Sequence, residues 1–156
     1  MIPIIPVPWP GFKSTQEGIL QTERVESCMS VLFSNTRERG LLHVPTASST
    51  DESRDFHLHL DDFFEVIEET FARGTQGLVF GGWNGESEGL LHHLKLCGLH
   101  TGIEIQETSD LLGNDNLSRD IFSLPNGLVI VRSYTLLRNT YGASSRRYAV
   151  TTYYQL

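Results

Sequence analysis

The sequence predicts an α+β fold, because two helical segments stand among about eight short strand-like segments. Most neighbouring strand-like segments are separated by short turns, which favours antiparallel pairing. The chain has 156 residues, of which 39% are apolar and 20% are charged, so it has enough apolar side chains to form a core. We therefore expect a single domain, 1–156.

The N-terminal segment 1–12 is expected to be an extended arm. It contains four of the six prolines, and proline fixes φ and lacks the N–H that a helix needs. We expect the arm to lie on the body of the domain as an edge strand or a polyproline segment. An arm that docks a partner is the alternative.

A hairpin is expected next. Segments 19–34 and 41–44 are rich in apolar residues and are interpreted as strands, and the polar segment 35–40 between them is typical of a turn. The segment 46–54 is rich in Ser, Thr and Asp and is expected to be a loop.

A first helix is predicted over 61–73. Asp62 and Glu65 have capping-box spacing, an apolar stripe marks the face towards the core, and Gly74 follows as a stop. Asp61 and Asp62 together open this predicted helix.

A second helix is predicted over 86–97, with Gly98 as its stop. A short buried strand, 78–80, precedes it and ends at a tight turn that contains Gly81 and Gly82. Segment 110–119 is expected to be a polar loop, and Asn126-Gly127 predicts a hairpin turn. The remaining strand-like segments are 103–105, 121–122, 128–131, 134–137 and 148–154.

Composition excludes several classes of protein. The formal charge of −7 argues against a nucleic-acid partner, and no apolar run reaches the length of roughly 18 residues that a membrane span needs. We expect no membrane insertion. No secretory signal pattern is present, so the cytoplasm is the expected location, and the acidic composition and small size are compatible with a monomer.

Two cysteines, Cys28 and Cys97, do not make a disulfide framework and are expected to be reduced.

Cys28 and His43 are the candidate catalytic residues. They lie fifteen residues apart on the two predicted strands of one hairpin, and a thiol beside an imidazole is the working pair of a cysteine hydrolase. Taken alone, the pairing is a weak signal, because a free Cys in a strand is more often a small core residue, and His43 could likewise be a core histidine. Cys97 is interpreted as a packing residue, because the negative end of a helix dipole disfavours a thiolate.

Four histidines raise the question of zinc. His57 and His59 would share a face of a strand, and His92 and His93 lie on the second predicted helix. No Cys or carboxylate spacing completes a recognisable site, so we expect these histidines on polar faces and predict neither a metal nor an organic cofactor.

An ordered set of motifs supports a resemblance to a known family. In chain order these are Thr22, Ser27-Cys28 six positions further on, His43, the helical segment DDFFEVIEETFARG (61–74) and the strand GLVFGGW (77–83). The set spans roughly 19–133 and resembles the CheD family of chemoreceptor glutamine deamidases. The resemblance implies two mixed β-sheets packed as a sandwich and flanked by helices, the fold also found in deamidase toxins of the cytotoxic necrotizing factor type.

The resemblance also implies roles for individual residues. Cys28 would be the nucleophile, and His43 would be the base that activates it. Thr22 would orient the imidazole, and Ser27 would support an oxyanion hole formed by the backbone N–H of Cys28 and a neighbour. The substrate would be a protein that bears a glutamine, a chemoreceptor or another protein.

Some segments depart from the family. Arg24 and Glu26 stand where the family has glycines, and the segment after His43 is shortened to Val44-Pro45. The arm 1–12 and the C-terminal extension 135–156 have no counterpart. These departures indicate a substrate other than a chemoreceptor, and an exported effector is an alternative to a chemotaxis protein.

Two alternative functions remain open from the residues. One is a related amidohydrolase, such as an N-terminal asparagine amidohydrolase, in which a strand Cys also precedes a Gly-Gly strand. The other is a binding module that keeps the fold without turnover, which the charged Arg24 and Glu26 near the thiol would favour.

Overall fold

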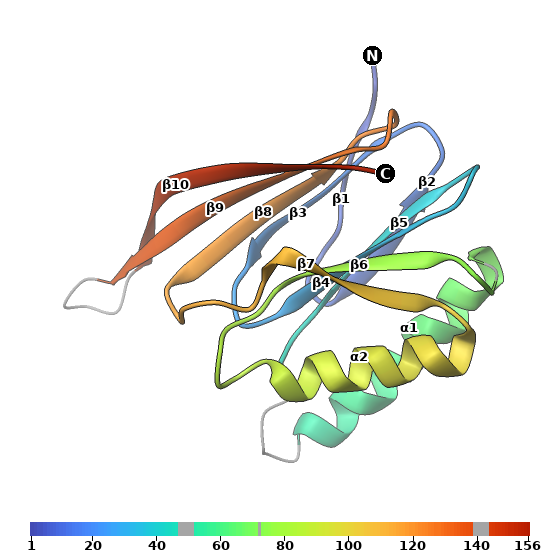
Figure 1. The fold of residues 1–156 in the computed structure, drawn as a ribbon, viewed down its shortest axis with the longest axis horizontal. Helices are drawn as coiled ribbons and strands as arrows, with labels where there is room; N and C mark the ends of the chain where they lie inside the picture. Colours follow the sequence, from blue (N-terminus) through green and yellow to red (C-terminus); the bar gives the residue numbers. More distant parts are fainter. Residues whose placement is uncertain (47–51, 72, 139–143) are drawn as a thin grey trace.

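The computed structural model describes residues 1–46, 52–71, 73–138 and 144–156. Two mixed five-stranded sheets pack against each other, and two helices cover the outer face of one sheet (Figure 1). The predicted α+β class, and the two mixed sheets flanked by helices that the resemblance implied, are therefore confirmed.

The elements have the following bounds in chain order: β1 (Ile4–Pro6), β2 (Gly11–Thr15), β3 (Ile19–Val25), β4 (Met29–Ser34), β5 (Arg39–Val44), α1 (Glu52–Thr70), β6 (Gln76–Gly81), α2 (Glu88–Thr101), β7 (Glu104–Leu111), β8 (Leu117–Ser123), β9 (Leu128–Arg138) and β10 (Ser144–Gln155). The first sheet has the order β1-β3-β8-β9-β10, and the second has the order β2-β5-β4-β6-β7. The β1/β3 and β6/β7 pairs are parallel, and α2 forms the crossover between β6 and β7.

The second sheet is buried on both faces. Along β4, Val31 and Phe33 belong to the core between the sheet and the helices, whereas Leu32 belongs to the core between the two sheets. Side chains of a strand alternate between faces, so a strand covered on both sides has a continuous apolar run. This explains the apolar stretch 31–33 of β4.

The predicted hairpin is confirmed for β4 and β5, which pair antiparallel. The prediction of one strand over 19–34 is wrong, because β3 belongs to the first sheet and β4 to the second. The chain leaves the first sheet after Val25; just before that point Arg24 has φ 55° and the β3/β8 register shifts. Cys28 therefore lies in the connection between the sheets and not within a strand.

The N-terminal arm forms edge strands in both sheets. β1 pairs with β3 in the first sheet, and β2 pairs with β5 in the second. The prediction of an edge strand is confirmed, and the arm crosses from one sheet to the other at the end of the sandwich where Cys28 lies.

Helix α1 starts earlier than predicted, at Glu52 and not at Asp61. The proposed capping box of Asp62 and Glu65 is wrong, because both residues lie inside the helix. The predicted strand with His57 and His59 is wrong for the same reason. Of the predicted loop 46–54, residues 47–51 lie outside the described residues, and the prediction is wrong for 52–54, which belong to α1. Apolar residues alternate with polar ones at Phe56, Leu58 and Leu60, a pattern that is also typical of a strand. In the helix, one buried stripe contains Leu60, Phe64, Ile67 and Phe71.

Helix α2 runs from Glu88 to Thr101, and its stop is Gly102, which has φ 76°. The prediction that Gly98 ends the helix is wrong, because Gly98 is buried inside it. The loop predicted over 110–119 is shorter, since β7 ends at Leu111 and β8 begins at Leu117.

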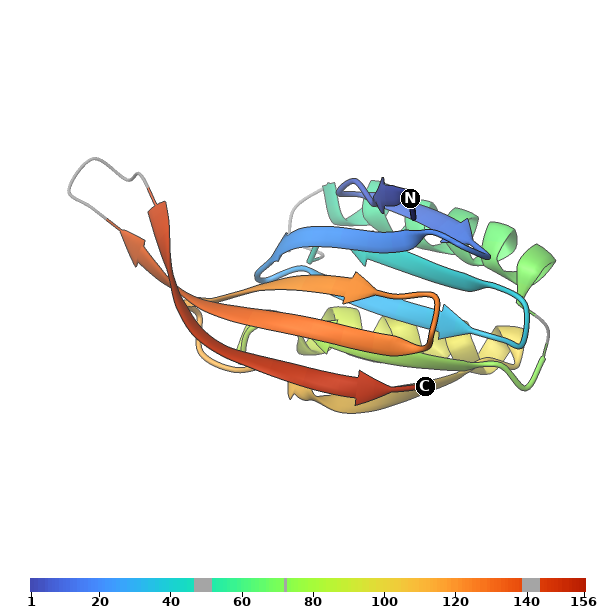
Figure 2. The ribbon, with the colours of Figure 1, turned by 90° about the horizontal axis from the view of Figure 1, so that it is seen from above.

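The C-terminal strands form long hairpins. Gly127 has φ 86° in the turn between β8 and β9, as the Asn-Gly signal predicts. The segments expected at 128–131 and 134–137 form one strand, β9, which pairs with β10. Figure 2 shows the far ends of β9 and β10 extending past the other strands of the sandwich. Among the described residues, no helix has both the length and the apolar character that a membrane crossing requires.

Candidate functional site

Thr22, Cys28 and His43 meet at one end of the space between the sheets. Leu41 lies in the core between the sheets, and alternation along β5 places His43 on the same face. Leu20 and Thr22 are related in the same way on β3. The two sheets therefore each present one of these side chains, and the connection from β3 to β4 brings Cys28 beside them.

The three side chains form a hydrogen-bonded chain. Cys28 Sγ lies 2.8 Å from His43 Nε2, and Thr22 Oγ1 lies 2.7 Å from His43 Nδ1. The Thr22 hydroxyl donates to the carbonyl oxygen of Val7 at 3.1 Å, so its oxygen accepts from Nδ1–H. This assignment leaves the Nε2 lone pair facing the thiol, as a general base requires.

Burial keeps both reactive groups uncharged. Cys28 is 7% exposed and His43 is 2% exposed. Burial raises the pKa of the Cys28 thiol to about 11, although the backbone N–H of Glu26 donates to Sγ at 3.3 Å and opposes that shift. Burial also lowers the pKa of His43 to about 4. The resting pair is therefore a neutral thiol beside a neutral imidazole.

The connection that contains Cys28 is held by neighbouring backbone and hydroxyl groups. The carbonyl oxygen of Ser27 accepts hydrogen bonds of 2.6 Å from both Thr46 Oγ1 and Ser87 Oγ. The N–H of Gly82 donates to the carbonyl oxygen of Glu26 at 3.0 Å. The contacts of Ser27 therefore hold the connection in place, and its role beside an oxyanion hole stays a prediction.

The two glycines of the tight turn permit this close approach. Gly81 and Gly82 have φ values of 89° and 85°. A Cβ on Gly81 would lie 2.3 Å from Val25 Cγ1 and 3.0 Å from the carbonyl oxygen of Cys28. Side chains at these positions would displace the connection that contains Cys28, so Gly81 and Gly82 allow the chain after β6 to pack against it.

Arg24 and Glu26 form one rim of the site. Their side chains make an ion pair of 3.4 Å between Nε and Oε2, and Glu26 Oε2 also accepts from Ser118 Oγ at 2.9 Å. The backbone N–H of Arg24 donates to Asp120 Oδ1 at 3.0 Å. Arg24 and Glu26 are thus fixed to each other and to β8.

A pocket of about 570 Å³ opens above the thiol. Cys28, His43 and Ser27 line it together with residues that the sequence analysis did not single out, namely Trp9, Glu23, Pro45 and Thr46. Trp9 is exposed and belongs to the arm, where the four prolines were the only signal. The arm therefore contributes a wall of the pocket and, through Val7, the partner of Thr22.

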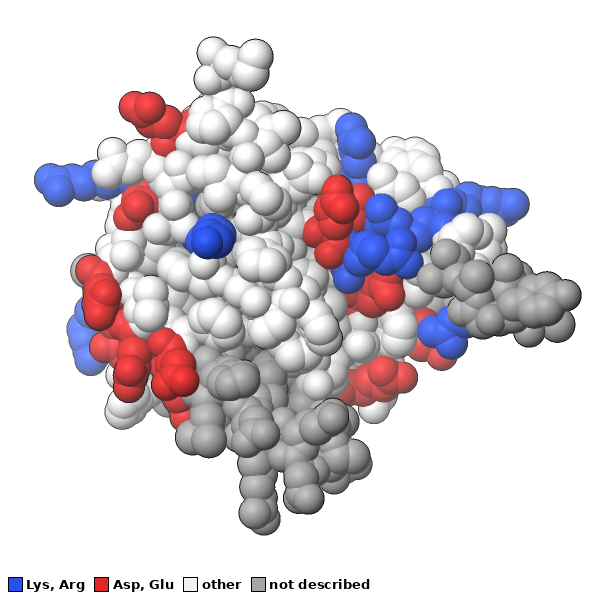
Figure 3. Space-filling model, turned by 180° about the vertical axis from the view of Figure 1, so that it is seen from behind, with Lys and Arg blue, Asp and Glu red and all other residues white. Residues whose placement is uncertain are grey.

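Cys97 lies elsewhere, on α2, in the core between the helices and the second sheet. It is buried, as predicted for a packing residue, and both cysteines are free thiols. On the face of the molecule opposite to Figure 1, the middle is largely uncharged, a group of acidic side chains lies at the lower left, and acidic and basic side chains lie side by side at the right (Figure 3).

Comparison with known proteins does not assign the chain to a family. No protein-family model matches the sequence, and no curated protein matches it. The resemblance to the CheD family stays a prediction from the order of the motifs.

Proposed function

We propose that the chain is a cysteine-dependent amidohydrolase that converts protein-bound glutamine to glutamate and releases ammonia. The observation that supports this proposal best is the 2.8 Å contact between Cys28 Sγ and His43 Nε2, with Thr22 behind the imidazole at 2.7 Å. A pocket gives a substrate access to the thiol. A nucleophile, a base and an orienting group are the set that acyl transfer from an amide needs.

In the first half of the reaction, Cys28 Sγ attacks the carboxamide carbon while His43 Nε2 takes the thiol proton. The C–N bond then breaks, and His43 returns this proton to the leaving nitrogen. Ammonia departs and a thioester joins Cys28 to the substrate. The neutral resting pair is suited to this step, because the thiol loses its proton only as the carbon is attacked.

In the second half, water attacks the thioester and gives one proton to His43 Nε2. The C–S bond breaks, the proton returns to Cys28 Sγ, and the substrate leaves as glutamate. The backbone N–H of Glu26, which points at Sγ, is our candidate for an oxyanion donor together with that of Cys28.

Thr22 is proposed as a positioning residue. Its oxygen accepts from Nδ1–H of His43 because its own proton is committed to Val7. Replacement by Val keeps the shape and removes this acceptor. Thr22→Val should lower kcat and change the pH dependence of the rate, whereas Thr22→Ser should restore both.

The test uses peptides with an internal Gln, an internal Asn or an N-terminal Asn, with ammonia release and mass spectrometry as readouts. We expect conversion of internal Gln by the wild type and by Cys97→Ser, none by Cys28→Ala, and a loss on the order of 10²–10⁴-fold for His43→Gln. Both Cys28→Ala and Cys97→Ser remove a buried thiol, so Cys97→Ser controls for structural damage.

Other outcomes decide between the alternatives. Conversion of N-terminal Asn alone would contradict the glutamine proposal and favour the related amidohydrolase. Turnover that persists in Cys28→Ala would refute cysteine catalysis. No conversion of any peptide or of intact protein substrates would favour the binding module.

We propose the cytoplasm as the location and a glutamine-bearing protein as the partner. A nucleophilic thiol must stay reduced, and reducing compartments maintain that state. The pocket opens at the surface beside the exposed Trp9, which suits a side chain presented by another protein.

A further inference from the structure

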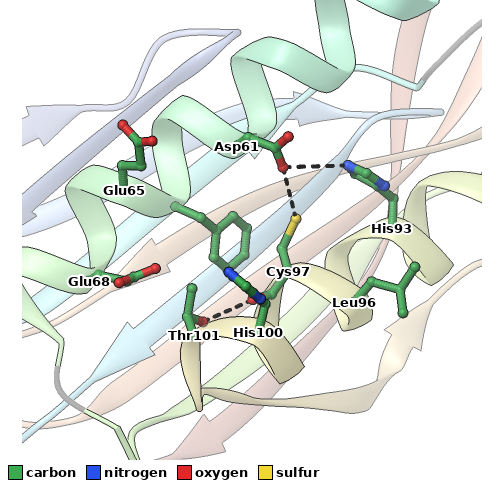
Figure 4. Close-up of a pocket in the computed structure, with 9 residues that line it drawn as sticks. Asp61, Glu65, Glu68, His93, Leu96, Cys97, His100 and Thr101 are labelled. Carbon is green, nitrogen blue, oxygen red and sulfur yellow. Dashed lines mark hydrogen bonds and ion pairs between the residues drawn. The ribbon is translucent and has the colours of Figure 1, made fainter.

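The groove between α1 and α2 is lined by side chains that can bind a metal ion. It has a volume of about 530 Å³ and lies on the far side of the second sheet from Cys28. Asp61 of α1 faces His93 and Cys97 of α2 across this groove (Figure 4). These three residues are separate from the residues that the proposed function uses.

The spacing on α2 is that of two metal ligands on one helix. Residues four apart lie on the same face of a helix, so His93 and Cys97 point to the same side. The ligand atoms of all three residues lie within 4.8 Å of one another. Asp61 supplies the third donor from the opposite helix.

The donor separations are close to those of a tetrahedral zinc site. Zn–S of about 2.3 Å, with Zn–O and Zn–N of about 2.0 Å, places tetrahedral donors roughly 3.5 Å apart for S···O and roughly 3.3 Å apart for N···O. Asp61 Oδ1 lies 3.6 Å from Cys97 Sγ and 3.9 Å from His93 Nε2. The Asp61–Cys97 separation already matches the expected value, and Asp61 Oδ1 and His93 Nε2 would have to move closer together by roughly 0.6 Å to bind the ion.

The chemistry of the cluster favours a cation. Cys97 is buried and its thiol lies beside the Asp61 carboxylate. A divalent ion between the two groups would compensate the carboxylate and bind the thiolate, and the thiol proton would be released to solvent.

We propose that Asp61, His93 and Cys97 form a Zn²⁺ site that joins α1 to α2. One thiolate, one imidazole and one carboxylate match the donor preference of zinc better than that of calcium or magnesium, which take oxygen ligands. Three protein ligands leave the fourth position open to the groove. Glu65, Glu68 and His100 also line the groove.

The test uses Co²⁺, which replaces Zn²⁺ and gives a thiolate-to-metal absorption band. Cys28 and His43 also bring a thiol and an imidazole together, so the experiment is done in Cys28→Ser, where Cys97 is the only thiol. We expect a charge-transfer band that saturates at one Co²⁺ per chain and is displaced by Zn²⁺. Absence of the band in Cys28→Ser would overturn the proposal.

Variants of the ligands complete the test. In the Cys28→Ser background, Cys97→Ser should abolish the band, and Asp61→Asn and His93→Gln should weaken Co²⁺ binding by at least tenfold. His92→Gln, the exposed neighbour of His93, is the matched control and should bind like its parent. Asp61 is exposed, so Asp61→Asn tests the site even if the buried Cys97→Ser fails to fold.

Zinc should also stabilise the fold. A ligand that binds only the folded state raises Tm, and this shift should appear in Cys28→Ser and vanish in Asp61→Asn. Equal shifts in both variants would contradict the proposal. None of these readouts uses amide hydrolysis, so the zinc site and the proposed deamidase activity succeed or fail separately.

Discussion

Arg24 has a backbone conformation that ordinarily favours glycine. Its φ of 55° lies in the left-handed region, where the Cβ of other residues is crowded. The hydrogen bond from its N–H to Asp120 and the ion pair with Glu26 hold it there. This strained conformation lies one residue before the end of β3, where the chain turns towards the second sheet.

Arg24→Gly should increase the free energy of unfolding by about 1 kcal/mol, because relief of the left-handed strain outweighs the loss of the partly exposed ion pair with Glu26. Urea denaturation of the variant measures this change. Arg37→Gly, in the β4–β5 turn, is the control, because Arg37 does not have a positive φ. This substitution should lower the free energy of unfolding by about 0.5–1 kcal/mol. Equal losses in both variants would contradict the strain at Arg24.

His43 should make stability depend on pH. Its pKa is lowered from 6.5 to about 4 by burial, so between these values the unfolded chain binds a proton that the folded chain does not. The stability linked to His43 is fully present above pH 6.5 and is lost as the pH falls towards 4, by roughly 3 kcal/mol. Denaturation from pH 7 to pH 4 measures this slope.

His43→Gln should reduce the slope of the free energy of unfolding against pH, by an amount that corresponds to at most one proton per chain. Cys28→Ser keeps His43 buried and should keep the wild-type slope, because burial is the cause of the shift. A wild-type slope in His43→Gln would show that another group is responsible.

At the scale of elements, α2 contains two glycines with opposite requirements. A Cβ on Gly98 would lie 2.6 Å from the carbonyl oxygen of Ile103 and 2.6 Å from Ile105 Cγ1. A Cβ on Gly89 would meet nothing within 4 Å. Gly98 therefore permits the close approach between α2 and β7, whereas Gly89 only adds flexibility to the first turn.

Gly98→Ala should lower the free energy of unfolding by about 1–3 kcal/mol through overpacking, although alanine is the better helix former. Gly89→Ala should raise it by about 0.5 kcal/mol through helix propensity alone. Thermal and urea unfolding compare the two. If both substitutions raised the free energy of unfolding, α2 and β7 would be able to move apart without loss of stability, which would contradict the prediction.

At the scale of the whole molecule, Arg39 joins the two sheets. It lies at the start of β5 in the second sheet and is buried. Its guanidinium donates to the carbonyl oxygen of Ser123 at 2.6 Å, at the end of β8, and to the carbonyl oxygen of Gly18. Both acceptors belong to the first sheet or the turn before it, so one side chain bridges the sandwich.

Arg39→Ala should lower the free energy of unfolding by about 2–4 kcal/mol, because it leaves two buried carbonyl groups without their donor. Arg37→Ala removes an exposed arginine two residues away and should change stability by less than about 0.5 kcal/mol. A loss below 0.5 kcal/mol for Arg39→Ala would show that other contacts hold the sheets together.

The local patterns of the sequence predicted much of the fold and half of the candidate site. The β4–β5 hairpin, the Asn-Gly turn and the apolar stripe of α1 all follow from alternation and turn chemistry, which act between residues close in the chain. The hairpin suggested that Cys28 and His43 lie near each other, although Cys28 precedes β4 and the strand partner of His43 is Ser30. The place of Thr22 followed only from the resemblance, and the i, i+4 spacing of His93 and Cys97 gave no hint of Asp61.

Long-range contacts account for the remainder. Whether β3 and β4 share a sheet depends on their partners β8 and β6, which lie far along the chain. The same contacts bring Thr22 across the sandwich to His43, and they set Asp61 opposite Cys97. Local hydrogen bonding and hydrophobic periodicity specify where a helix or strand forms, whereas the packing of whole layers decides which side chains meet.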